Sequence, residues 1–311
     1  MKNKTILITG ASGFLGTWLA DEVFEAGYEL IGIDLRAPSR PEIWSNFVTA
    51  STDNVDWENL LHGKDIYGVC HLAGGASVAL SVNDPYSDFS NLLPGTARLA
   101  LYLSKMHSQA KFILFSSAAV YGNASALPIV EETIAVPISP YGIHKYIAEL
   151  LLENYSRIYG LSVTVLRIFS VYGPGLRKQL IWDVGNRAIA ADKQGKEAIT
   201  LFGTGDETRD FIYVKDLCES VVNLLNNQTD NKFQLCNMAS GIESSVSEIA
   251  NGLIKHLDLN VKINFDGNIP KGDPLNVRAD INRLKSTGAK INYSLDMGLE
   301  QVAKWIKTIN G

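Results

Sequence analysis

A tyrosine and a lysine stand four residues apart in the segment from Tyr141 to Lys145. On a helix, residues with this spacing share one face, so the phenol and the ammonium would lie side by side. A free phenol titrates at about 10, too high for a base at neutral pH, and a nearby ammonium favours the phenolate. We therefore expect Lys145 to lower the pKa of Tyr141 towards working pH. Ser117, at the end of an apolar run, offers a hydroxyl that can relay the proton.

A glycine-rich loop near the N-terminus carries a second chemical signal. Gly10, Gly13 and Gly16 follow the apolar run Thr5–Thr9, and an amphipathic stretch comes next. Glycines let the backbone approach a pyrophosphate closely, and the first N–H groups of a following helix face the phosphates. The loop therefore predicts a site for a dinucleotide cofactor.

The next apolar run ends in an acid, Asp34. In dinucleotide sites an acid at this place accepts hydrogen bonds from the adenine-side ribose, and its charge repels the extra phosphate of NADP. Arg36 weakens this inference because an arginine can pair with such a phosphate. The balance favours NAD as the cofactor.

These residues need a scaffold, and the apolar pattern predicts one. Short apolar runs predict strands at Thr5–Thr9, Glu29–Asp34, Phe47–Thr49, Ile66–His71, Lys111–Ser116 and Ser162–Arg167. Longer amphipathic runs predict helices at Phe14–Glu25, Trp57–His62, Thr96–Met106 and Tyr141–Tyr159. Strands that alternate with helices are typical of βαβ units on a parallel sheet, so the predicted fold class is α/β.

The pattern changes after about residue 167. Segments become shorter and the loops between them are rich in Gly and Pro, which is typical of a smaller ligand-capping region. A predicted helix at Val214–Asn226 and a strand at Phe233–Cys236 are expected to return to the first domain. The predicted last helix, Asp296–Ile309, has no evident chemical role.

Bulk properties exclude several classes of partner. The 311 residues are 46% hydrophobic, enough for a full core, and the net charge of −5 comes without blocks of like charge. We therefore expect no nucleic-acid or membrane partner. Cys70, Cys218 and Cys236 show no metal or disulfide spacing and are expected to be reduced core thiols. No signal peptide or membrane-spanning run is evident, so a cytoplasmic location is expected.

Several motifs together resemble those of one family. In chain order they are TGASGFLG, DNVD, HLAG, SSAAVYG, SPYGIHK, LRIFSVYGPG and TRDFIYVKD. They resemble the extended short-chain dehydrogenase/reductases that act on nucleotide-sugars, over almost the whole chain. The resemblance implies a Rossmann domain, a doubly wound parallel sheet that binds NAD, in residues 1–170 plus about 211–238. It also implies a smaller mixed α/β C-terminal domain, residues 171–210 and 239–311, for the nucleotide-sugar.

The resemblance also implies roles for single residues. Tyr141 would be the base, Lys145 would hold the nicotinamide ribose, and Ser117 would assist as a third catalytic residue. Asp53 would hold the adenine amino group. The segment from His71 to Ala73 would pass under the pyrophosphate, with His71 itself a packed strand-end residue. The expected NAD-binding set is Gly10, Ser12, Gly13, Phe14, Leu15, Gly16, Asp34, Leu35, Arg36, Asp53, Asn54, Leu72, Ala73, Gly74, Tyr141 and Lys145.

Two alanines reduce the number of candidate reactions. Dehydratases of this family carry Asp-Glu just after the serine position, where this chain has Ala118 and Ala119. Two methyl groups cannot supply the acid and base that eliminate water, so dehydration is not expected. The family's nucleotide-glucuronate decarboxylases tend to carry a Glu at the second position, so Ala119 argues mildly against them too.

Epimerisation and ketosugar reduction remain as candidate reactions. An epimerase lets NAD remove a hydride, usually from C4 of the sugar, and returns it to the other face of the ketone. A reductase uses an exchangeable and often phosphorylated cofactor, so Asp34 favours the NAD-dependent 4-epimerase over the NAD(P)H-dependent 4-ketosugar reductase. A non-catalytic NAD-binding sensor or scaffold is a third hypothesis, but it need not keep Ser117, Tyr141 and Lys145 together.

The substrate end departs from the family pattern. Ser170 stands where many epimerases have Asn, and Leu92 stands at another usual Asn position, with Asn91 one residue early. Pro270 replaces an expected arginine and is followed by Lys271. We therefore expect a modified or less common nucleotide-sugar, as in polysaccharide biosynthesis.

Several cations can meet the diphosphate. Arg209 matches the family's diphosphate-binding arginine, whose fork can hold two phosphate oxygens. Arg177, Lys178 and Arg278 can supply further positive charge. The expected substrate-binding set is Ser117, Ser170, Arg177, Arg209, Lys271 and Arg278, and no metal ligand is expected.

The resemblance further suggests a homodimer. It would form through the predicted helices Thr96–Met106 and Tyr141–Tyr159. Their apolar faces would serve an ordinary core equally well; they include Leu99, Tyr102, Leu103, Ile147, Leu151 and Tyr155.

Overall fold

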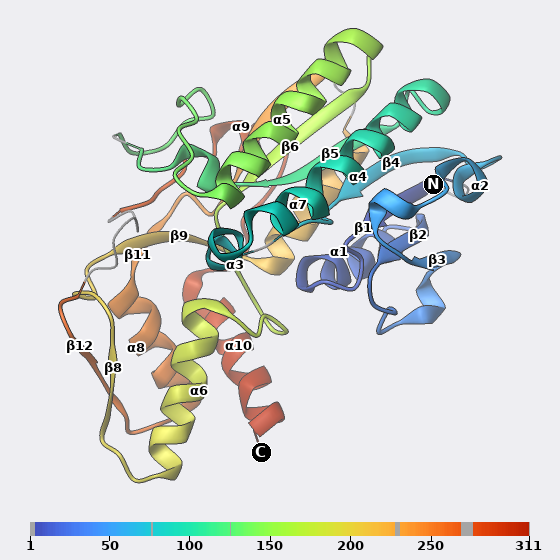
Figure 1. The fold of residues 1–311 in the computed structure, drawn as a ribbon. Coiled ribbons are helices and arrows are strands. Elements are labelled where there is room, and N and C mark those ends of the chain that lie inside the picture. Colours follow the sequence, from blue (N-terminus) through green and yellow to red (C-terminus); the bar gives the residue numbers. More distant parts are fainter. Residues whose placement is uncertain (1–3, 76, 125, 228–230, 269–275, 311) are drawn as a thin grey trace.

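The computed structural model describes residues 4–75, 77–124, 126–227, 231–268 and 276–310. In this part of the chain a seven-stranded parallel sheet has the order β10-β6-β5-β4-β1-β2-β3 (Figure 1). The strand order reverses at β1 and β4, and in such sheets ligands bind outside the carboxyl ends of the strands at this point. Its strands are β1 (Thr5–Thr9), β2 (Glu29–Asp34), β3 (Asn46–Thr49), β4 (Ile66–His71), β5 (Lys111–Ser117), β6 (Ser162–Ile168) and β10 (Phe233–Met238).

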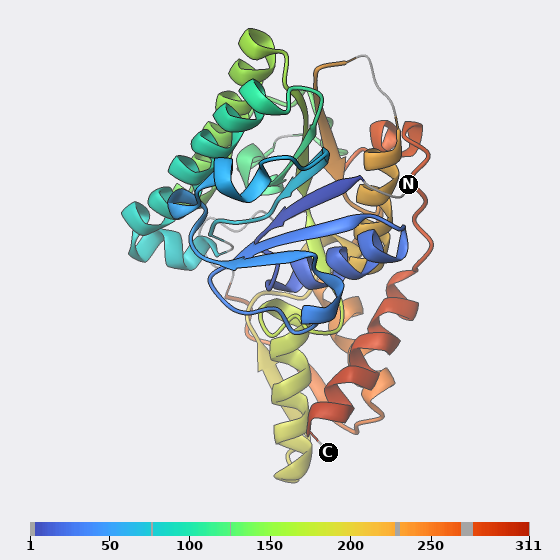
Figure 2. The ribbon, with the colours of Figure 1, turned by 90° about the vertical axis from the view of Figure 1, so that its right-hand side faces the viewer.

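Helices cover both faces of this sheet (Figure 2). Successive residues of a strand point to opposite faces, so Ile6 and Ile8 belong to one buried core and Leu7 to the other. The first core includes α1 (Phe14–Glu25) and α7 (Val214–Asn226), which pack together. The second core includes α2 (Trp57–Leu61), α4 (Pro85–Met106) and α5 (Pro140–Tyr159). The predicted α/β, doubly wound Rossmann fold is confirmed.

The helix α5 begins and ends on recognisable signals. The Ser139 side chain accepts a hydrogen bond from the Gly142 N–H at 3.2 Å, and Pro140 occupies the first helical position, where its missing N–H costs nothing. The helix ends at Gly160, whose φ of 73° is the left-handed conformation that glycine adopts without strain. These signals fix the start of the helix one residue before Tyr141.

The helix α4 begins eleven residues earlier than the predicted start at Thr96. Pro94 lies inside it, and a proline there removes one hydrogen bond and normally ends or kinks a helix. Here the Asp84 side chain caps the N-terminus by accepting a hydrogen bond from the Ser87 N–H at 3.0 Å. Pro85 supplies the first residue. Packing against α5 outweighs the cost of the internal proline.

The rest of the chain forms a smaller group of elements, in the lower part of Figure 1. β9 (Thr208–Tyr213) pairs with β7 (Ser170–Tyr172) and β11 (Glu243–Ser245), and β8 (Ala198–Leu201) pairs with β12 (Lys262–Phe265). The helices of this group are α6 (Gln179–Lys193), α8 (Val246–Leu257) and α10 (Leu295–Asn310), with α10 packed on α8. The helix α9 (Asn282–Ser286) is the exception, because it packs on β10 of the main sheet, in the upper part of Figure 1. The predicted return of β10 to the main sheet is observed, while the residue limits of the two domains stay a prediction.

Short elements complete the list. α3 (Val78–Asn83) precedes α4, and single 3-10 turns lie at Pro41–Ile43, Thr52–Asn54 and Ala118–Tyr121. Cys70, Cys218 and Cys236 are buried and free. Within the described ranges, every helix is too short or too polar to cross a bilayer.

Candidate active site

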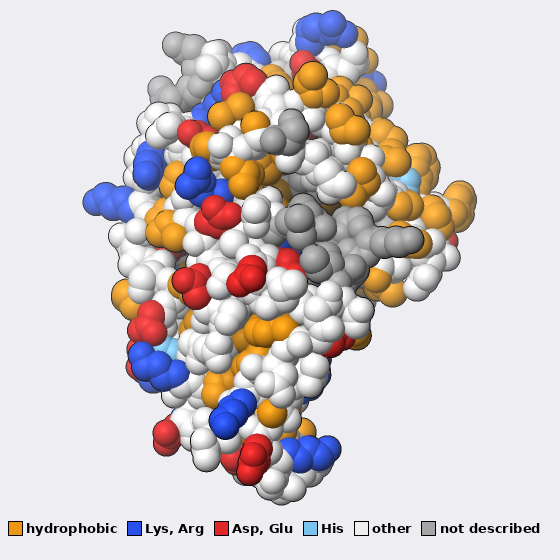
Figure 3. Space-filling model, turned by 90° about the vertical axis from the view of Figure 1, so that its left-hand side faces the viewer, with side chains coloured by type: hydrophobic (Ala, Val, Ile, Leu, Met, Phe, Trp, Pro, Cys, Tyr) orange, Lys and Arg blue, Asp and Glu red, His pale blue; other side chains and the backbone are white. Residues whose placement is uncertain are grey.

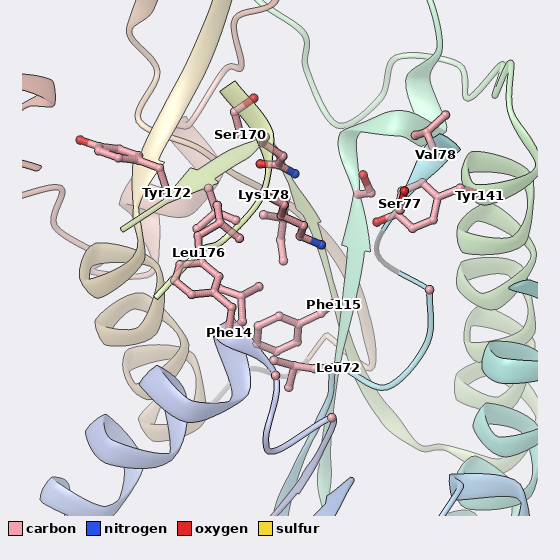
Figure 4. Close-up of a pocket in the computed structure, with 18 of the residues that line it drawn as sticks. Phe14, Leu72, Ser77, Val78, Phe115, Tyr141, Ser170, Tyr172, Leu176 and Lys178 are labelled. Carbon is pink, nitrogen blue, oxygen red and sulfur yellow. The ribbon is translucent and has the colours of Figure 1, made fainter. Parts of the chain in front are cut away.

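One cavity, of about 1320 Å³, opens between the carboxyl ends of the sheet strands and the smaller group of elements. The glycine loop, the end of β2 and the segment after β4 line one part of it, and α5, β7 and the segment before α6 line another. Figure 4 shows side chains of both parts pointing at one another, with Phe14 and Leu72 on one side and Ser170 and Lys178 on the other. The sequence-predicted catalytic residues Ser117, Tyr141 and Lys145 all line this cavity.

The glycines of the loop lie in close contact with other main-chain atoms. Gly10 has a φ of +70°, and a Cβ built on it would lie 2.9 Å from the Ala73 nitrogen. A Cβ on Gly16 would lie 2.2 Å from the Gly10 carbonyl oxygen, so no side chain fits there. Gly13 precedes α1 without a side-chain cap, which leaves the first N–H groups of the helix for a ligand. This loop therefore fits a pyrophosphate.

Asp34 lies at the end of β2 beside this loop. Its carboxylate accepts hydrogen bonds from the Ser12 N–H at 3.0 Å and the Arg36 N–H at 2.9 Å, and it lines the cavity. The Arg36 guanidinium donates to the Ser12 carbonyl and lies 3.7 Å from the carboxylate. Arg36 thus closes the loop onto β2, and the predicted contact of Asp34 with the adenine-side ribose stays a prediction.

The predicted cofactor residues do not all reach the cavity. The cavity is lined by Phe14, Leu15, Leu35 and the run Leu72–Gly74, together with residues named above. Ser12 is at its edge through its hydrogen bonds to Asp34 and Arg36.

Asp53 and Asn54 lie next to the cavity wall. They belong to the 3-10 turn after β3, and the neighbouring Ser51 and Thr52 line the cavity in their place. The Asp53 carboxylate lies 3.7 Å from Arg98 of α4. Their predicted contact with adenine stays a prediction.

The three catalytic candidates meet at the end of β5. Tyr141 lies beside Ser117, and both line the cavity, while the buried Lys145 donates from Nζ to the Phe115 carbonyl at 2.8 Å. The Lys145 Nζ lies 5.8 Å from the centre of the Tyr141 ring. The shared helical face that the spacing predicts brings phenol and ammonium into one corner of the cavity.

The predicted effect of Lys145 on Tyr141 is wrong in this structure. Burial raises the pKa of Tyr141, and the hydrogen bond from Ser117 is what opposes that rise. Lys145 is directed at Phe115, and burial lowers the pKa of Lys145 itself to about 8. The chain alone therefore keeps Tyr141 protonated.

His71 is a packed strand-end residue, as expected. Its Nδ1 and Nε2 each lie 2.8 Å from a threonine hydroxyl, those of Thr9 and Thr96. The Thr96 hydroxyl donates to the Leu92 carbonyl, and the Thr9 hydroxyl accepts from the Ala73 N–H. Burial lowers the pKa of His71 to about 3, so the ring is neutral and ties β4 to α4.

The substrate end gathers fewer of the predicted residues. Ser170, Arg177 and Arg209 line the cavity, whereas Arg278 does not. Arg278 instead holds the segment before α5 through its carbonyl, which accepts from the Ile129 N–H at 2.8 Å. Lys271 lies outside the described residues.

Several cavity residues were missed by the sequence analysis. Ser77 and Val78 at the start of α3, and Phe202 after β8, line the cavity, and Figure 4 shows the first two beside Tyr141. Lys178, considered only as spare charge, extends into the cavity, and burial lowers its pKa. Only the tertiary fold brings these segments to the site, so no local pattern could have found them. Among the described residues no cluster of side chains could hold a metal ion.

Comparison with known proteins agrees with this geometry. The model of the NAD dependent epimerase/dehydratase family matches residues 6–239. The chain belongs to this family. The cavity residues that fit a dinucleotide are therefore those of an NAD-dependent enzyme, and NAD is its cofactor.

Individual members of the family resemble the whole chain. A putative UDP-glucose 4-epimerase of Methanocaldococcus jannaschii is 32% identical over 98% of this chain and 99% of that protein. The crystal structure of UDP-glucose 4-epimerase with UDP-glucose from Thermotoga maritima has a TM-score of 0.87 and 28% identity, covering 99% of this chain and 100% of that chain. The UDP-glucuronic acid 4-epimerase of Bacillus cereus, in complex with UDP-glucuronic acid and NAD, has a TM-score of 0.85 and 29% identity, covering 98% and 99%.

Proposed function

We propose that this family member is a nucleotide-sugar 4-epimerase. One observation carries the proposal: Tyr141 and Ser117 line the same cavity as the glycine loop and Arg209. A phenol at one end, a dinucleotide cradle beside it and an arginine at the far end fit a sugar alcohol joined to a diphosphate. The similarity to UDP-sugar 4-epimerases supports this assignment.

Each residue has a defined task in the proposed reaction. Ser117 holds the reacting sugar hydroxyl and the Tyr141 oxygen in one hydrogen-bonded line. Tyr141 takes the proton of the C4 hydroxyl and gives it back after the ketone has turned over. NAD, when bound, accepts the C4 hydride and returns it, and its positively charged ring favours the Tyr141 phenolate. Lys145, fixed on Phe115, is placed to hold the nicotinamide ribose.

The local residues argue against the other reactions. Ala118 and Ala119, in the 3-10 turn after Ser117, carry only methyl groups, whereas elimination of water would need an acid and a base there. The lack of a Glu at Ala119 argues mildly against decarboxylation as well. The ketosugar reductase stays the alternative, and Asp34, which lines the cavity and whose charge would repel the extra phosphate of NADP, favours the NAD-dependent epimerase.

A panel of UDP-sugars incubated with the purified protein, with the products followed by NMR, tests the reaction. Epimer formation without net change of NADH is expected. Stoichiometric loss of NADPH on a 4-ketosugar would establish the reductase instead. Tyr141→Phe should lower turnover by roughly 10²- to 10⁴-fold and leave NAD binding nearly intact, because it removes only the proton acceptor. Unchanged turnover would remove Tyr141 from the mechanism, and a protein that binds NAD but converts no sugar would be a sensor or scaffold.

The proposed substrate is a modified nucleotide-sugar of polysaccharide synthesis. Ser170 lines the cavity where an amide is usual in the family, and Lys178 adds a cation beside it. A pocket with a short hydroxyl side chain and an ammonium group differs from one that binds an unmodified neutral hexose. If UDP-galactose is turned over as fast as every other sugar of the panel, this part of the proposal fails.

We further propose a homodimer through α4 and α5, the predicted helices, together with α3 and with a partly different set of side chains. Leu99 and Leu103 are buried in the core of the chain itself, so they are not available to a partner. Hydrophobic side chains instead gather along the upper right edge of Figure 3, which is the front of Figure 1, where α3, α4 and α5 lie. The exposed ones on these helices include Val78, Leu80, Val82, Tyr86, Phe89, Ile143, Ile147 and Leu150. Sedimentation equilibrium should give a dimer at micromolar concentration, and a monomer would contradict the proposal.

A further inference from the structure

A buried acid and a histidine lie beside the catalytic corner without a task in the reaction above. His144 Nδ1 of α5 lies 2.6 Å from Asp88 Oδ2 of α4. The two side chains are 12% and 8% exposed, so neither is solvated as a surface pair would be. A buried carboxylate needs such a donor, because burying a charge without a partner is costly.

The pair is part of the wall behind the cavity. His144 stands between Tyr141 and Lys145 on α5, and the edge of Phe89 packs against its ring with the centroids 5.6 Å apart. A Cβ built on Gly75 would lie 2.0 Å from the Asp88 Oδ1, and Gly75 lines the cavity. The second carboxylate oxygen is therefore pressed against the backbone that borders the site.

Few other charges face this corner. On α5 they are those of Lys145 and Glu149, and Glu149 is engaged by Arg167 at 2.7 Å. On α4, Asp84 caps the helix by accepting from the Ser87 N–H. The helix α3 carries no ionisable side chain, and its Ser81 hydroxyl accepts from the Tyr141 N–H at 3.0 Å. On β4 the neutral His71 faces Lys145. Among the described residues, Asp88 is thus the anion that acts on both Tyr141 and Lys145.

We propose that Asp88 and His144 form a positioning pair, in which His144 holds the Asp88 carboxylate beside Tyr141 and Lys145 and so sets the pH at which Tyr141 changes its proton. Neither residue touches the substrate. The carboxylate favours the Lys145 ammonium and disfavours the Tyr141 phenolate, since charges of like sign repel. The imidazole holds the carboxylate in this place, because a buried carboxylate needs a hydrogen-bond donor.

The sign of the effect on Tyr141 follows. Burial is the main cause of the raised pKa of Tyr141, and the charge of Asp88 adds to it, so removing that charge lowers the pKa and brings the phenolate out at lower pH. Asp88→Asn keeps the shape and removes the charge. His144→Leu keeps the carboxylate but removes its donor, and should act in the same direction. His144→Asn places an amide nitrogen where the ring Nδ1 stands, so it should restore the native behaviour.

The test uses the NAD-loaded protein and needs no sugar. The ultraviolet phenolate absorbance of Tyr141 is isolated by subtracting the spectrum of a matched Tyr141→Phe protein at each pH, in each background. We expect the midpoint to fall by roughly one pH unit in Asp88→Asn, and in the same direction in His144→Leu, with His144→Asn close to the original chain. Folding of the His144→Leu protein is checked by circular dichroism, and Asp88→Asn carries the test if that protein does not fold.

An unmoved midpoint in Asp88→Asn, with a lower melting temperature, would overturn the proposal, since it would show a purely structural pair. The pH profile of turnover extends the test, and this part rests on the proposed function. Both limbs of the profile should move to lower pH in Asp88→Asn. Because the absorbance measurement involves no substrate, failure of the epimerase assignment leaves its outcome readable.

Discussion

The walls at the two ends of the cavity differ in kind, since one consists mainly of main-chain atoms and the other of side chains. At the cofactor end the wall is backbone: Gly10 and Gly16 lie against other main-chain atoms with no room for a Cβ, and Asp34 is locked by two main-chain N–H groups. At the substrate end the wall consists of side chains from separate segments, among them Ser170 and Arg209. Backbone contacts leave few alternative arrangements, whereas side chains can be exchanged singly.

This difference explains why one scaffold can keep a cofactor and change a substrate. A substitution in the glycine loop must move the main chain of β1 and α1, which are part of the core. A substitution at Ser170 or Lys178 changes one side chain of the cavity wall and leaves the sheet of seven strands intact. Cofactor recognition is therefore rigid, and sugar recognition is adjustable.

Gly16→Ala should have the largest effect of these substitutions, because it alters the rigid cofactor end. Its new Cβ would fall 2.2 Å from the Gly10 carbonyl oxygen, and main-chain atoms cannot give way as the end of a side chain can. We expect NAD affinity to fall by more than about 100-fold and the free energy of unfolding to fall by about 1–3 kcal/mol, as for other overpacked sites. Calorimetric titration with NAD and thermal unfolding measure the two effects.

Gly13→Ala is the matched control in the same loop. A Cβ there would lie 3.1 Å from the same carbonyl, and Gly13 has a φ of −76°, which any residue adopts. Its loss of NAD affinity should stay below about tenfold, which corresponds to about 1.4 kcal/mol. Equal losses in both variants would mean that the loop yields as a whole, and the distinction between a rigid and an adjustable end would disappear.

The cofactor end was also the part most accessible to sequence reasoning. The strand Thr5–Thr9 and the helix Phe14–Glu25 were predicted with their observed limits, because the glycines and the apolar period are local signals. The helix α4 was predicted too short, since Pro94 is a local breaker that tertiary packing overrides. The helix α6 was not predicted at all, because its surroundings are rich in loop residues.

The substrate end and the proton chemistry were less accessible for the same physical reason. Lys178 and Phe202 reach the cavity only because α6 and β8 fold back over the sheet ends. The spacing of Tyr141 and Lys145 predicts their neighbourhood but not the direction of Nζ, which the carbonyl of Phe115 decides. Burial, which the sequence does not state, then reverses the expected change in the pKa of Tyr141.

Substitution of Arg209 should show the adjustable end with a smaller and purely local effect. A charge-assisted hydrogen bond contributes about 1.5–3 kcal/mol, so Arg209→Gln should weaken UDP binding roughly 10- to 100-fold. Arg209→Lys keeps the charge but loses the fork of the guanidinium, so its UDP affinity should lie between those of the original chain and Arg209→Gln. NAD affinity and thermal stability should not change, because Arg209 lines the cavity away from the glycine loop. Arg157→Gln, on the exposed last turn of α5, controls for loss of positive charge. If Arg209→Gln weakens NAD as much as UDP, the two ends are coupled through the main chain, and the substrate end is as rigid as the cofactor end.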